Sequence, residues 1–397
     1  MEAITMDFSL LRDFMDSLTD WIIPGNCVKV CVDNKEVFSY QSGYEDYENK
    51  VEMSGEKLLN IFSCSKPVTA IAALQLFEKG CFLLDTPLYD FIPEYRHLTV
   101  KDKDGNIREA KGDITMRHLF TMTAGLNYNL RTPEIEEARA LTDGKMNTLT
   151  VAKCIAKTPL SFDPGDRWQY SLCHDVLAAA VEAISGKKFR DYVKENIFSL
   201  LEMNESYYHN EEVIDRVAKL YRYVDSAETN LVKLQSSSGE VSRGALENVS
   251  KDVVYSLGPE YDSGGAVITT SISDYSKFAS ALANGGVGAN GEQIISASTI
   301  ELMRTNQLNV YQRSGMTWSQ LSGYGYGLGV RTLIDKAKAG SCGNLGEFGW
   351  GGAAGATLLV DPDLHLSVAY AHHMLNPQEG YYQPRLRNVV YSCLGRK

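Results

Sequence analysis

Apolar residues recur at helical spacing near the start of the chain. They are Phe8, Leu11, Met15, Leu18 and Ile22, with Asp13, Asp16 and Asp20 between them. Side chains three and four positions apart share one face of a helix, so this pattern predicts an amphipathic helix over residues 8–23. Pro24-Gly25 ends the predicted helix, because proline and glycine both interrupt helical structure.

Two segments that follow alternate between apolar and polar residues. Residues 27–33 and 37–42 are predicted strands, and Asp33-Asn34-Lys35 indicates the turn of a hairpin between them. Residues 58–62 are typical of a further short strand. Near the other end of the chain we expect strands over 326–332, 354–360 and 366–371, followed by a helix over 385–394.

Between these β-rich ends the pattern is mostly helical. The predicted helices span residues 68–79, 114–122, 150–157, 175–185 and 189–201, and a further helix spans 273–283. The first of these is apolar on nearly all sides and is therefore expected to be buried. Residues 225–262 are polar and irregular, and the run from Ser236 to Gly239 indicates an exposed loop.

The order of the elements favours an α/β (α+β) fold in two parts. Residues 1–66 and 263–397 are expected to form a discontinuous α/β domain, with residues 67–262 inserted as a mostly helical domain. Pockets often form where two domains meet, so we expect the functional site in the cleft between them. The polar segment over 225–262 is expected to border that cleft.

The composition is that of a globular protein, with 44% hydrophobic and 22% charged residues among 397. The formal net charge of −11 argues against nucleic acid as a partner, since phosphate binding needs clustered Lys and Arg. The first residues lack the basic start and apolar core of a secretory signal, and no stretch approaches about 20 apolar residues. We therefore expect a cytoplasmic protein with no membrane partner, whose eight scattered cysteines stay reduced.

The signals for cofactors and metals are weak. The stretch from Gly286 to Gly291 matches G-x-G-x-x-G, but it follows a helix and precedes a strand, the reverse of a dinucleotide site. We interpret it as a hairpin-like loop. The chain has no C-x-x-C pair and no H-E-x-x-H sequence, and His372-His373 stands alone, so we expect neither a metal nor a cofactor.

Ser63 is the candidate nucleophile. It precedes Lys66 by three residues, between an apolar strand-like run and an apolar helix. Pro67 is tolerated only in the first turn of a helix, which places Ser63 near the helix N-terminus among free backbone N–H groups. Ser-x-x-Lys is a common pattern that also begins at Ser54 and Ser185, and an N-cap role for Ser63 stays open.

Two later stretches carry further candidates. In residues 162–172 a Pro-Gly turn precedes Trp168 and Tyr170, and Tyr170 could be either a packed aromatic residue or an acid–base group. Residues 346–357 are rich in glycine at the start of a predicted strand. So many glycines imply a close approach of the backbone, either to a ligand or to a packed helix.

Taken in this order, the three stretches resemble the serine β-lactamase and penicillin-binding-protein superfamily, and within it they look most like the family VIII carboxylesterases. The resemblance covers nearly the whole chain. Its supporting segments are residues 114–126, 164–168, 197–198, 201–203, 263–266 and 306–308. It implies a β-lactamase/transpeptidase-like fold, in which helices flank an antiparallel sheet and a mostly helical domain is inserted.

The resemblance places the family's nucleophile on Ser63, its active-site lysine on Lys66 and its tyrosine on Tyr170. The family's third element, Lys-Thr-Gly in true β-lactamases, falls on Trp350-Gly351-Gly352. Leu172 stands where the family usually has asparagine, and Trp350 stands where β-lactamases have lysine. Both departures favour uncharged esters, because the missing polar groups hold the amide and carboxylate of a β-lactam.

The implied reaction is acyl transfer through an acyl-enzyme on Ser63. Lys66, its pKa lowered by burial and a neighbouring hydroxyl, takes the serine proton together with Tyr170, which returns a proton to the leaving alcohol. Backbone N–H groups of Ser63 and Ala353 are expected to form the oxyanion hole. The expected substrate-binding residues are Trp350, Gly351, Gly352, Tyr128 and Leu172, with Trp350 and Tyr128 lining an aromatic pocket.

Four functions fit these residues, and a serine hydrolase of small carboxylic esters is favoured. A β-lactamase or D-amino-acid peptidase, similar to a DD-carboxypeptidase, would want a cationic residue near the cleft and usually an exported chain. An acyltransferase shares every named residue and differs in the nucleophile that enters. A non-catalytic binding module would typically lose Ser63, Lys66 or Tyr170. The expected partner is a small-molecule ester or amide substrate.

Overall fold

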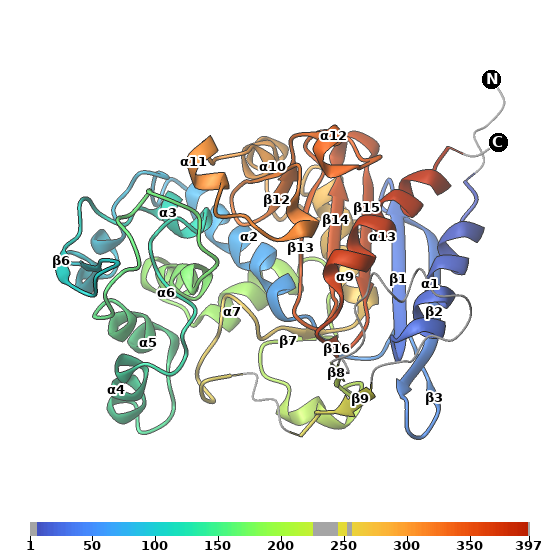
Figure 1. Cartoon of the computed structure of the whole chain (residues 1–397), viewed down its shortest axis with the longest axis horizontal. Helices are drawn as coiled ribbons and strands as arrows, with labels where there is room; N and C mark the ends of the chain where they lie inside the picture. The colour runs from blue at the N-terminus through green and yellow to red at the C-terminus, as the bar shows by residue number, and fades with distance from the viewer. Residues whose placement is uncertain (1–5, 225–244, 252–255, 396–397) are drawn as a thin grey trace.

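An eight-stranded antiparallel sheet is the central layer of the molecule (Figure 1). The computed structural model describes residues 6–224, 245–251 and 256–395. In spatial order the strands are β11 (Tyr324–Tyr326), β12 (Arg331–Leu333), β13 (Phe348–Gly351), β14 (Thr357–Asp361), β15 (Leu366–Ala371), β1 (Gly25–Val32), β2 (Lys35–Asp46) and β3 (Val51–Glu52). The sheet thus joins the two ends of the chain, because β1 pairs with β15 and Cys27 lies opposite Ala371.

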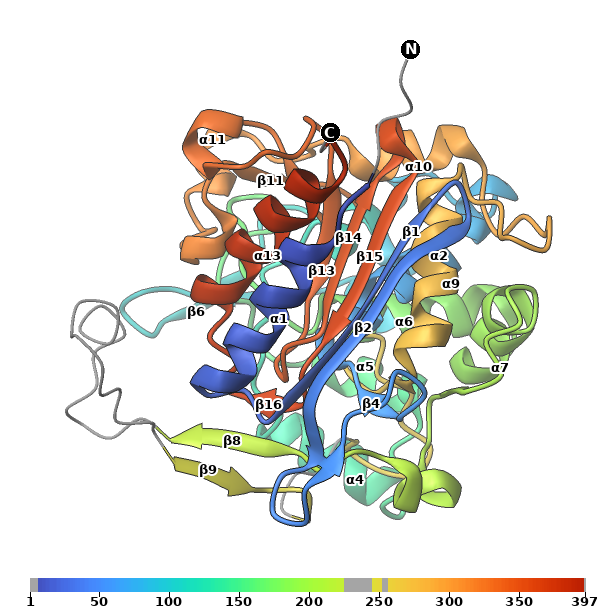
Figure 2. The same ribbon diagram turned by 90° about the vertical axis from the view of Figure 1, so that its right-hand side faces the viewer.

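Two helices from opposite ends of the chain cover one face of this sheet. They are α1 (Ser9–Trp21) and α13 (Glu379–Cys393), which lie side by side (Figure 2). Leu11 of α1 and Leu386 of α13 share one apolar core with Val28 and Val368 of the sheet. Alternate strand residues point to opposite faces, so this face takes every second side chain of β1 and β15.

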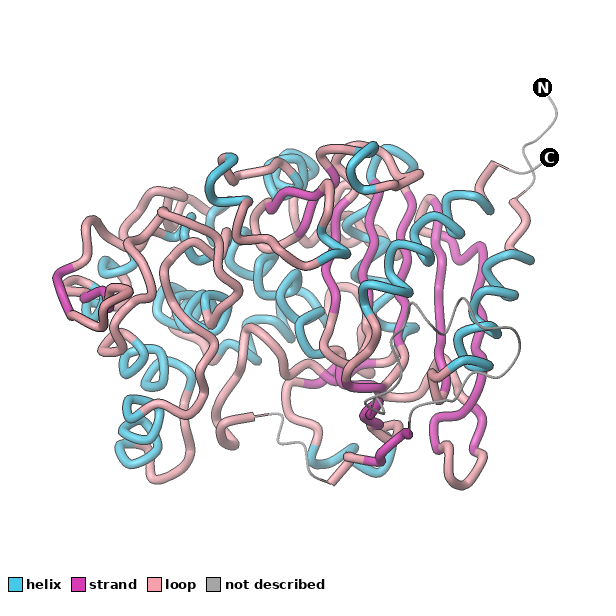
Figure 3. Tube along the Cα trace, in the orientation of Figure 1, coloured by secondary structure: helices cyan, strands magenta, loops and turns pink. Residues whose placement is uncertain are grey.

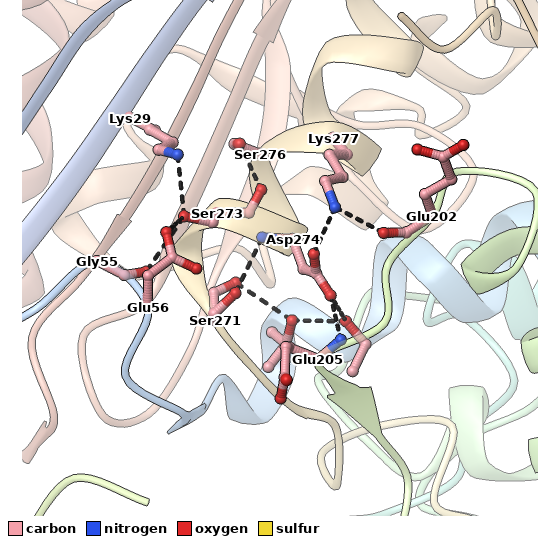
Figure 4. Close-up of polar contacts among 12 residues, drawn as sticks. Lys29, Gly55, Glu56, Glu202, Glu205, Ser271, Ser273, Asp274, Ser276 and Lys277 are labelled. Atoms are coloured by element: carbon pink, nitrogen blue, oxygen red, sulfur yellow. Dashed lines mark hydrogen bonds and ion pairs between the residues drawn. The ribbon is translucent and has the colours of Figure 1, made fainter. Parts of the chain in front are cut away.

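Helix α9 (Ile272–Ala283) covers the other face, where Cys27 and Ala369 join its apolar residues in the main core. Polar contacts fix the start of α9 (Figure 4). The Ser271 hydroxyl caps it by accepting from the Asp274 N–H at 3.1 Å, and Lys29 of β1 donates to Ser273 at 2.9 Å. This side-chain cap satisfies a backbone donor that the helix itself leaves free.

The other half of the molecule is mainly helical, as Figure 3 shows. Its helices are α2 (Ser65–Glu78), α3 (Met116–Phe120), α4 (Pro133–Leu141), α5 (Thr148–Ile155), α6 (Cys173–Ser185) and α7 (Phe189–Val193), which continues as a π-helical turn over Lys194–Phe198. Every residue of α2 from Ser65 to Leu76 is buried, which confirms the prediction of a helix that is apolar on nearly all sides. Outside this half lie α10 (Ala297–Arg304), α11 (Val310–Arg313) and α12 (Lys336–Ala339).

Three small sheets lie apart from the central one. The first holds β4 (Leu59–Asn60), β10 (Thr269–Thr270) and β7 (Ser206–Tyr207); the second holds β16 (Met374–Leu375), β8 (Tyr221–Val224) and β9 (Ala245–Asn248); the third pairs β5 (Thr99–Lys101) with β6 (Ile107–Glu109). Strand β4 immediately precedes Ser63, so its pairing with β10 anchors the segment that delivers the candidate nucleophile.

Several predicted elements are confirmed and two are wrong. Asp33 and Asn34 have φ of 51° and 59°, the conformation of a tight hairpin turn between β1 and β2. The single strand expected over 326–332 is instead the hairpin of β11 and β12, closed by a hydrogen bond from Gly327 N–H to Val330 O at 2.8 Å. The last helix begins at Glu379 and not at the predicted residue 385. Pro384 lies inside this helix.

The helical content and the all-antiparallel central sheet agree with the predicted α/β (α+β) class. The division into domains at residues 66 and 263 stays a prediction. Most of the polar segment expected over 225–262 lies outside the described residues, although residues 245–248 of it form β9. No helix in the described part of the chain has the length and apolar character needed to cross a membrane.

Candidate active site

A sharp turn between β4 and α2 presents Ser63. Phe62 adopts a left-handed φ of 46°, and the 3₁₀ turn Phe62–Cys64 leads directly into α2. A non-glycine residue in this region is strained, and such strain is common where a chain must present a functional group. Pro67 lies in the first turn of α2, as predicted, and Ser63 is 9% exposed.

The structure brings Ser63, Lys66 and Tyr170 together, and we call these three residues the catalytic cluster. The Lys66 ammonium donates to Ser63 Oγ at 3.1 Å and to the carbonyl oxygen of Gly265 at 2.8 Å. The Tyr170 hydroxyl donates to Ser63 Oγ at 2.5 Å. Both distances to Ser63 fall in the range over which a proton can be exchanged. Their catalytic roles remain a hypothesis from the sequence.

The electrostatic surroundings of Lys66 differ from the expectation. Burial favours the neutral amine, but the oxygens of Tyr128 and Tyr170 and the carboxylate of Asp175 outweigh it and raise the pKa of Lys66 above its ordinary value. The sequence-based expectation that burial and a neighbouring hydroxyl lower the pKa of Lys66 is wrong. Lys66 is therefore an ammonium in the resting protein.

Asp175 lies close to this ammonium across a single glycine. A Cβ placed on Gly265 would lie 2.7 Å from Asp175 Oδ2 and 3.3 Å from Lys66 Nζ, so no larger residue fits between the two charges. The other carboxylate oxygen of Asp175 accepts from Tyr261 and Ser263. The carboxylate is thus fixed beside Lys66, and sequence reasoning did not identify it.

The end of strand β13 lies against the turn that carries Ser63. A Cβ on Gly352 would lie only 2.2 Å from the carbonyl oxygen of Ile61, which explains the need for glycine there. The Cys64 thiol also donates to the carbonyl oxygen of Trp350 at 3.6 Å. This confirms a close backbone approach, and Ala353 lines the same cavity as Ser63. The oxyanion hole itself stays a prediction.

A cavity of about 130 Å³ opens beside Ser63. Part of its lining is an aromatic wall formed by Tyr170, Trp318 and Trp350. The ring of Tyr170 lies 5.1 Å from that of Trp318 and 5.9 Å from that of Trp350, centroid to centroid. Trp350 and Gly351 therefore lie where the sequence placed them, whereas Trp318 was not predicted.

The rest of the lining combines Leu321 and Ala353 with four polar side chains that the sequence did not predict. We call these four side chains the polar wall; they are Gln320, Arg331, Glu379 and Gln383. Glu379 and Gln383 lie one helical turn apart on α13, and both precede residue 385, where the predicted helix began. Their i, i+4 spacing places them on one face of the observed helix, which the sequence prediction did not include.

The other predicted substrate-binding residues lie elsewhere. Tyr128 stacks on Tyr170, with centroids 5.4 Å apart, but it lines a second cavity of about 760 Å³ together with Leu172. Leu172 is 3% exposed and belongs to the main core. Gly352 is buried against Ile61. The two cavities therefore lie on opposite sides of the Tyr170 ring, which Tyr128 and Trp350 both stack against.

Within residues 6–224, 245–251 and 256–395, no group of three or more His, Cys, Asp or Glu side chains is arranged to hold a metal ion.

A comparison with family models gives a match over residues 10–391 to the family described as Beta-lactamase. The chain belongs to the beta-lactamase family. The relatives similar to this chain include proteins named as an esterase and as an acyltransferase.

Among curated relatives, the esterase EstB of Burkholderia gladioli is 27% identical to this chain over 413 residues, covering 99% of this chain and 97% of the esterase. The acyltransferase calJ of Penicillium decumbens is 26% identical and covers 85% of this chain and 80% of its own. The resemblance to the serine β-lactamase and penicillin-binding-protein superfamily is thereby confirmed.

Among solved structures, EstCE1, a hydrolase with promiscuous acyltransferase activity, superposes with a TM-score of 0.75 at 24% identity over 96% of this chain and 97% of its own. Simvastatin synthase (LovD) from Aspergillus terreus superposes with a TM-score of 0.76 at 22% identity over 97% and 98%. Both likenesses confirm the predicted β-lactamase/transpeptidase-like fold.

Proposed function

We propose that this member of the beta-lactamase family is a serine esterase that cleaves small, uncharged carboxylic esters through an acyl-enzyme on Ser63. The observation that carries the proposal is the catalytic cluster: Ser63 Oγ lies within hydrogen-bonding distance of both Lys66 and Tyr170, at the wall of a cavity. A nucleophile, a proton acceptor and room for a substrate are the minimum that acyl transfer requires.

In the first half of the reaction, Ser63 Oγ forms a bond to the ester carbonyl carbon while the carbonyl π electrons move to its oxygen. The serine proton passes to the Lys66–Tyr170 pair, which must first have released one proton to water, because Lys66 is an ammonium at rest. The ammonium form of the pair then stabilises the negative charge of the tetrahedral intermediate, together with the backbone N–H groups of Ser63 and Ala353.

In the second half, the carbonyl reforms, the bond to the alkoxide breaks, and Tyr170 gives the leaving alcohol a proton. Water then attacks the acyl group on Ser63 by the same steps and releases the acid. The hydrogen bond from the Tyr170 hydroxyl to Ser63 Oγ, with the Trp350 ring of the cavity wall beside it, supports this role of Tyr170 in both transfers.

The cavity lining favours an ester over a β-lactam. Trp350 occupies the position of the family's lysine and packs its ring against Tyr326 at 5.2 Å, so no ammonium is available there for a β-lactam carboxylate. Arg331 does line the cavity, but Glu347 neutralises it through an ion pair at 2.8 Å. A neutral acyl or alcohol group therefore suits the aromatic wall better than a charged one.

The test compares the wild type with Ser63→Ala on p-nitrophenyl butanoate and on a chromogenic cephalosporin. We expect turnover of the ester, loss of at least about 10⁴-fold in kcat/KM in Ser63→Ala, and little turnover of the cephalosporin. A fluorophosphonate should add mass to the wild type alone. Ester turnover that survives in Ser63→Ala would refute the assignment of the nucleophile.

Acyl transfer to an alcohol is the second candidate, and the cavities favour it. The 760 Å³ cavity lined by Tyr128 lies across the Tyr170 ring from the Ser63 cavity, which leaves room for a second substrate. The names of the relatives calJ and EstCE1 also include acyltransferase activity. Adding an alcohol to the ester assay distinguishes the two, because a transferase forms the new ester faster than it releases the acid.

A further inference from the structure

The polar wall of the Ser63 cavity contains a buried donor without a partner. Arg331 of β12 is 1% exposed, and its Nη1 donates to Glu347 at 2.8 Å. Its Nη2 has no hydrogen-bond partner in the described part of the chain, although Arg331 lines the cavity. A buried donor without a partner is unfavourable, and a ligand atom in the cavity would satisfy it.

Glu379 supplies an acceptor to the same cavity from α13. Its Oε2 accepts from the Gln320 side chain at 3.3 Å, and no ion pair to Glu379 occurs within the described residues. A Cβ on Gly351 would lie 2.5 Å from Gln383 Nε2 and 3.5 Å from Glu379 Oε1, so both side chains reach the strand that borders Ser63. Burial also raises the pKa of Glu379 to about 7.

The Arg331 charge beside the polar wall is already paired. Arg331 forms an ion pair with Glu347 at 2.8 Å, and Arg387, two helical turns beyond Glu379 on α13, donates from its Nη2 to the Gln320 carbonyl oxygen at 3.2 Å. A charged ligand would be poorly solvated in this place, whereas a neutral group that both donates and accepts would lose little on leaving water.

We propose that the polar wall binds a hydroxyl group of the substrate, so that the enzyme prefers esters that carry a hydroxyl on their acyl or alcohol part. A hydroxyl can donate to Glu379 while it accepts from Arg331 or Gln383. An analogue with a methyl group in its place would leave those groups unpaired, which is how binding sites reject such analogues. This inference rests on the proposed esterase function.

The experiment uses pairs of esters that differ only by a methyl or a hydroxyl group. Ethyl butanoate is compared with ethyl 3-hydroxypropanoate for the acyl part, and propyl butanoate with 2-hydroxyethyl butanoate for the alcohol part. We expect a preference of about 10- to 100-fold in kcat/KM for the hydroxyl ester in one of the two pairs. The pair that shows it identifies the part of the ester that the polar wall holds.

Glu379→Leu tests the residue. We expect the hydroxyl-to-methyl ratio to fall to about one in Glu379→Leu, while the control Glu292→Leu, in an exposed loop, keeps the wild-type ratio. Ratios near one for both pairs in the wild type, or an unchanged ratio in Glu379→Leu, would overturn the inference. So would a stronger preference for an amine or a carboxylate at the same position of the ester.

Failure of this inference can be told from failure of the proposed function. Turnover of ethyl butanoate that is lost in Ser63→Ala supports the esterase whatever the hydroxyl ratio is. If no ester is turned over, binding to the wild type is followed through the fluorescence of Trp318 and Trp350, which line the cavity. Tighter binding of the hydroxyl ester would then support the inference, and equal binding would overturn it.

Discussion

The catalytic cluster and the polar wall border one cavity, yet they differ in how fully their polar atoms are bonded. In the cluster, the Lys66 ammonium donates to Ser63 and Gly265, and the Tyr170 hydroxyl also donates to Ser63. In the polar wall, Arg331 keeps a buried nitrogen without a partner in the described residues. The side chains that we propose to react are thus bonded to one another, whereas the side chains that we propose to bind a hydroxyl include a donor without a partner in the described residues.

The largest expected effect on the catalytic cluster comes from removing the Tyr170 hydroxyl. Tyr170→Phe keeps the stacked ring but removes the hydroxyl 2.5 Å from Ser63 Oγ, so we expect kcat for a butanoate ester to fall about 10²- to 10³-fold. The control is Tyr326→Phe, which removes a buried hydroxyl from the neighbouring ring and should change kcat less than about threefold. Equal effects in both variants would deny Tyr170 its role in proton transfer.

The contact between Gly352 and Ile61 gives the next largest expected effect. Gly352→Ala places a Cβ 2.2 Å from the Ile61 carbonyl oxygen, so the end of β13 must move away from Ser63. We expect kcat/KM to fall about 10- to 100-fold, since a donor in the oxyanion hole is displaced. Gly395→Ala, where a Cβ meets nothing, is the matched control. Full activity in Gly352→Ala would show that this contact does not position Ala353.

A smaller change is expected from Asp175→Asn. Removing the carboxylate beside Lys66 lowers the pKa of Lys66, so the pair can release its proton at lower pH. The acidic limb of the pH profile of kcat/KM should therefore move to lower pH by about one unit. Asp166→Asn, an exposed neighbour in sequence, should leave the limb in place. An unmoved limb in Asp175→Asn would remove Asp175 from the control of Lys66.

The smallest expected effect is on how the free energy of unfolding depends on pH, through Glu379 of the polar wall. The pKa of Glu379 in the folded protein, about 7, lies above the 4.5 of a free carboxyl group, so the folded state loses stability as pH rises from about 4.5 to 7. Glu379→Gln cannot lose that proton. From pH 5 to pH 8 the wild type should therefore lose about 1–3 kcal/mol of unfolding free energy relative to Glu379→Gln. Denaturant titrations at both pH values, with Glu292→Gln as control, measure this difference.

The catalytic cluster could be predicted because three short local patterns, taken in order, resemble those of a known family, although each pattern alone left another interpretation open. Ser63, Lys66 and Pro67 lie within one turn, and Tyr170 follows a recognisable Pro-Gly turn. The glycines around Trp350 likewise indicated a close approach, and the structure shows it at Gly352. These signals are local, and they depend little on how the rest of the chain folds.

The polar wall could not be predicted, because it exists only through tertiary contacts. Arg331 was expected within a single strand over 326–332 that is instead a hairpin, and Glu379 lies before the expected helix start at residue 385. The predicted direction of the Lys66 pKa shift was wrong for the same reason. Asp175 and Tyr128 reach it from separate segments, and no spacing in the sequence shows that they meet.

The pairing of β1 with β15 has a consequence for the making of the protein. Strand β1 ends at Val32, and its partner does not begin until Leu366, so the sheet has a high contact order and cannot close until residues 366–371 have been made. A nascent chain on the ribosome therefore exposes an unpaired edge of β1 while more than 300 further residues are added. Translation also finishes Ser63 long before Gly352 and Glu379, so the proposed site cannot assemble until the segment that carries Glu379 has been made.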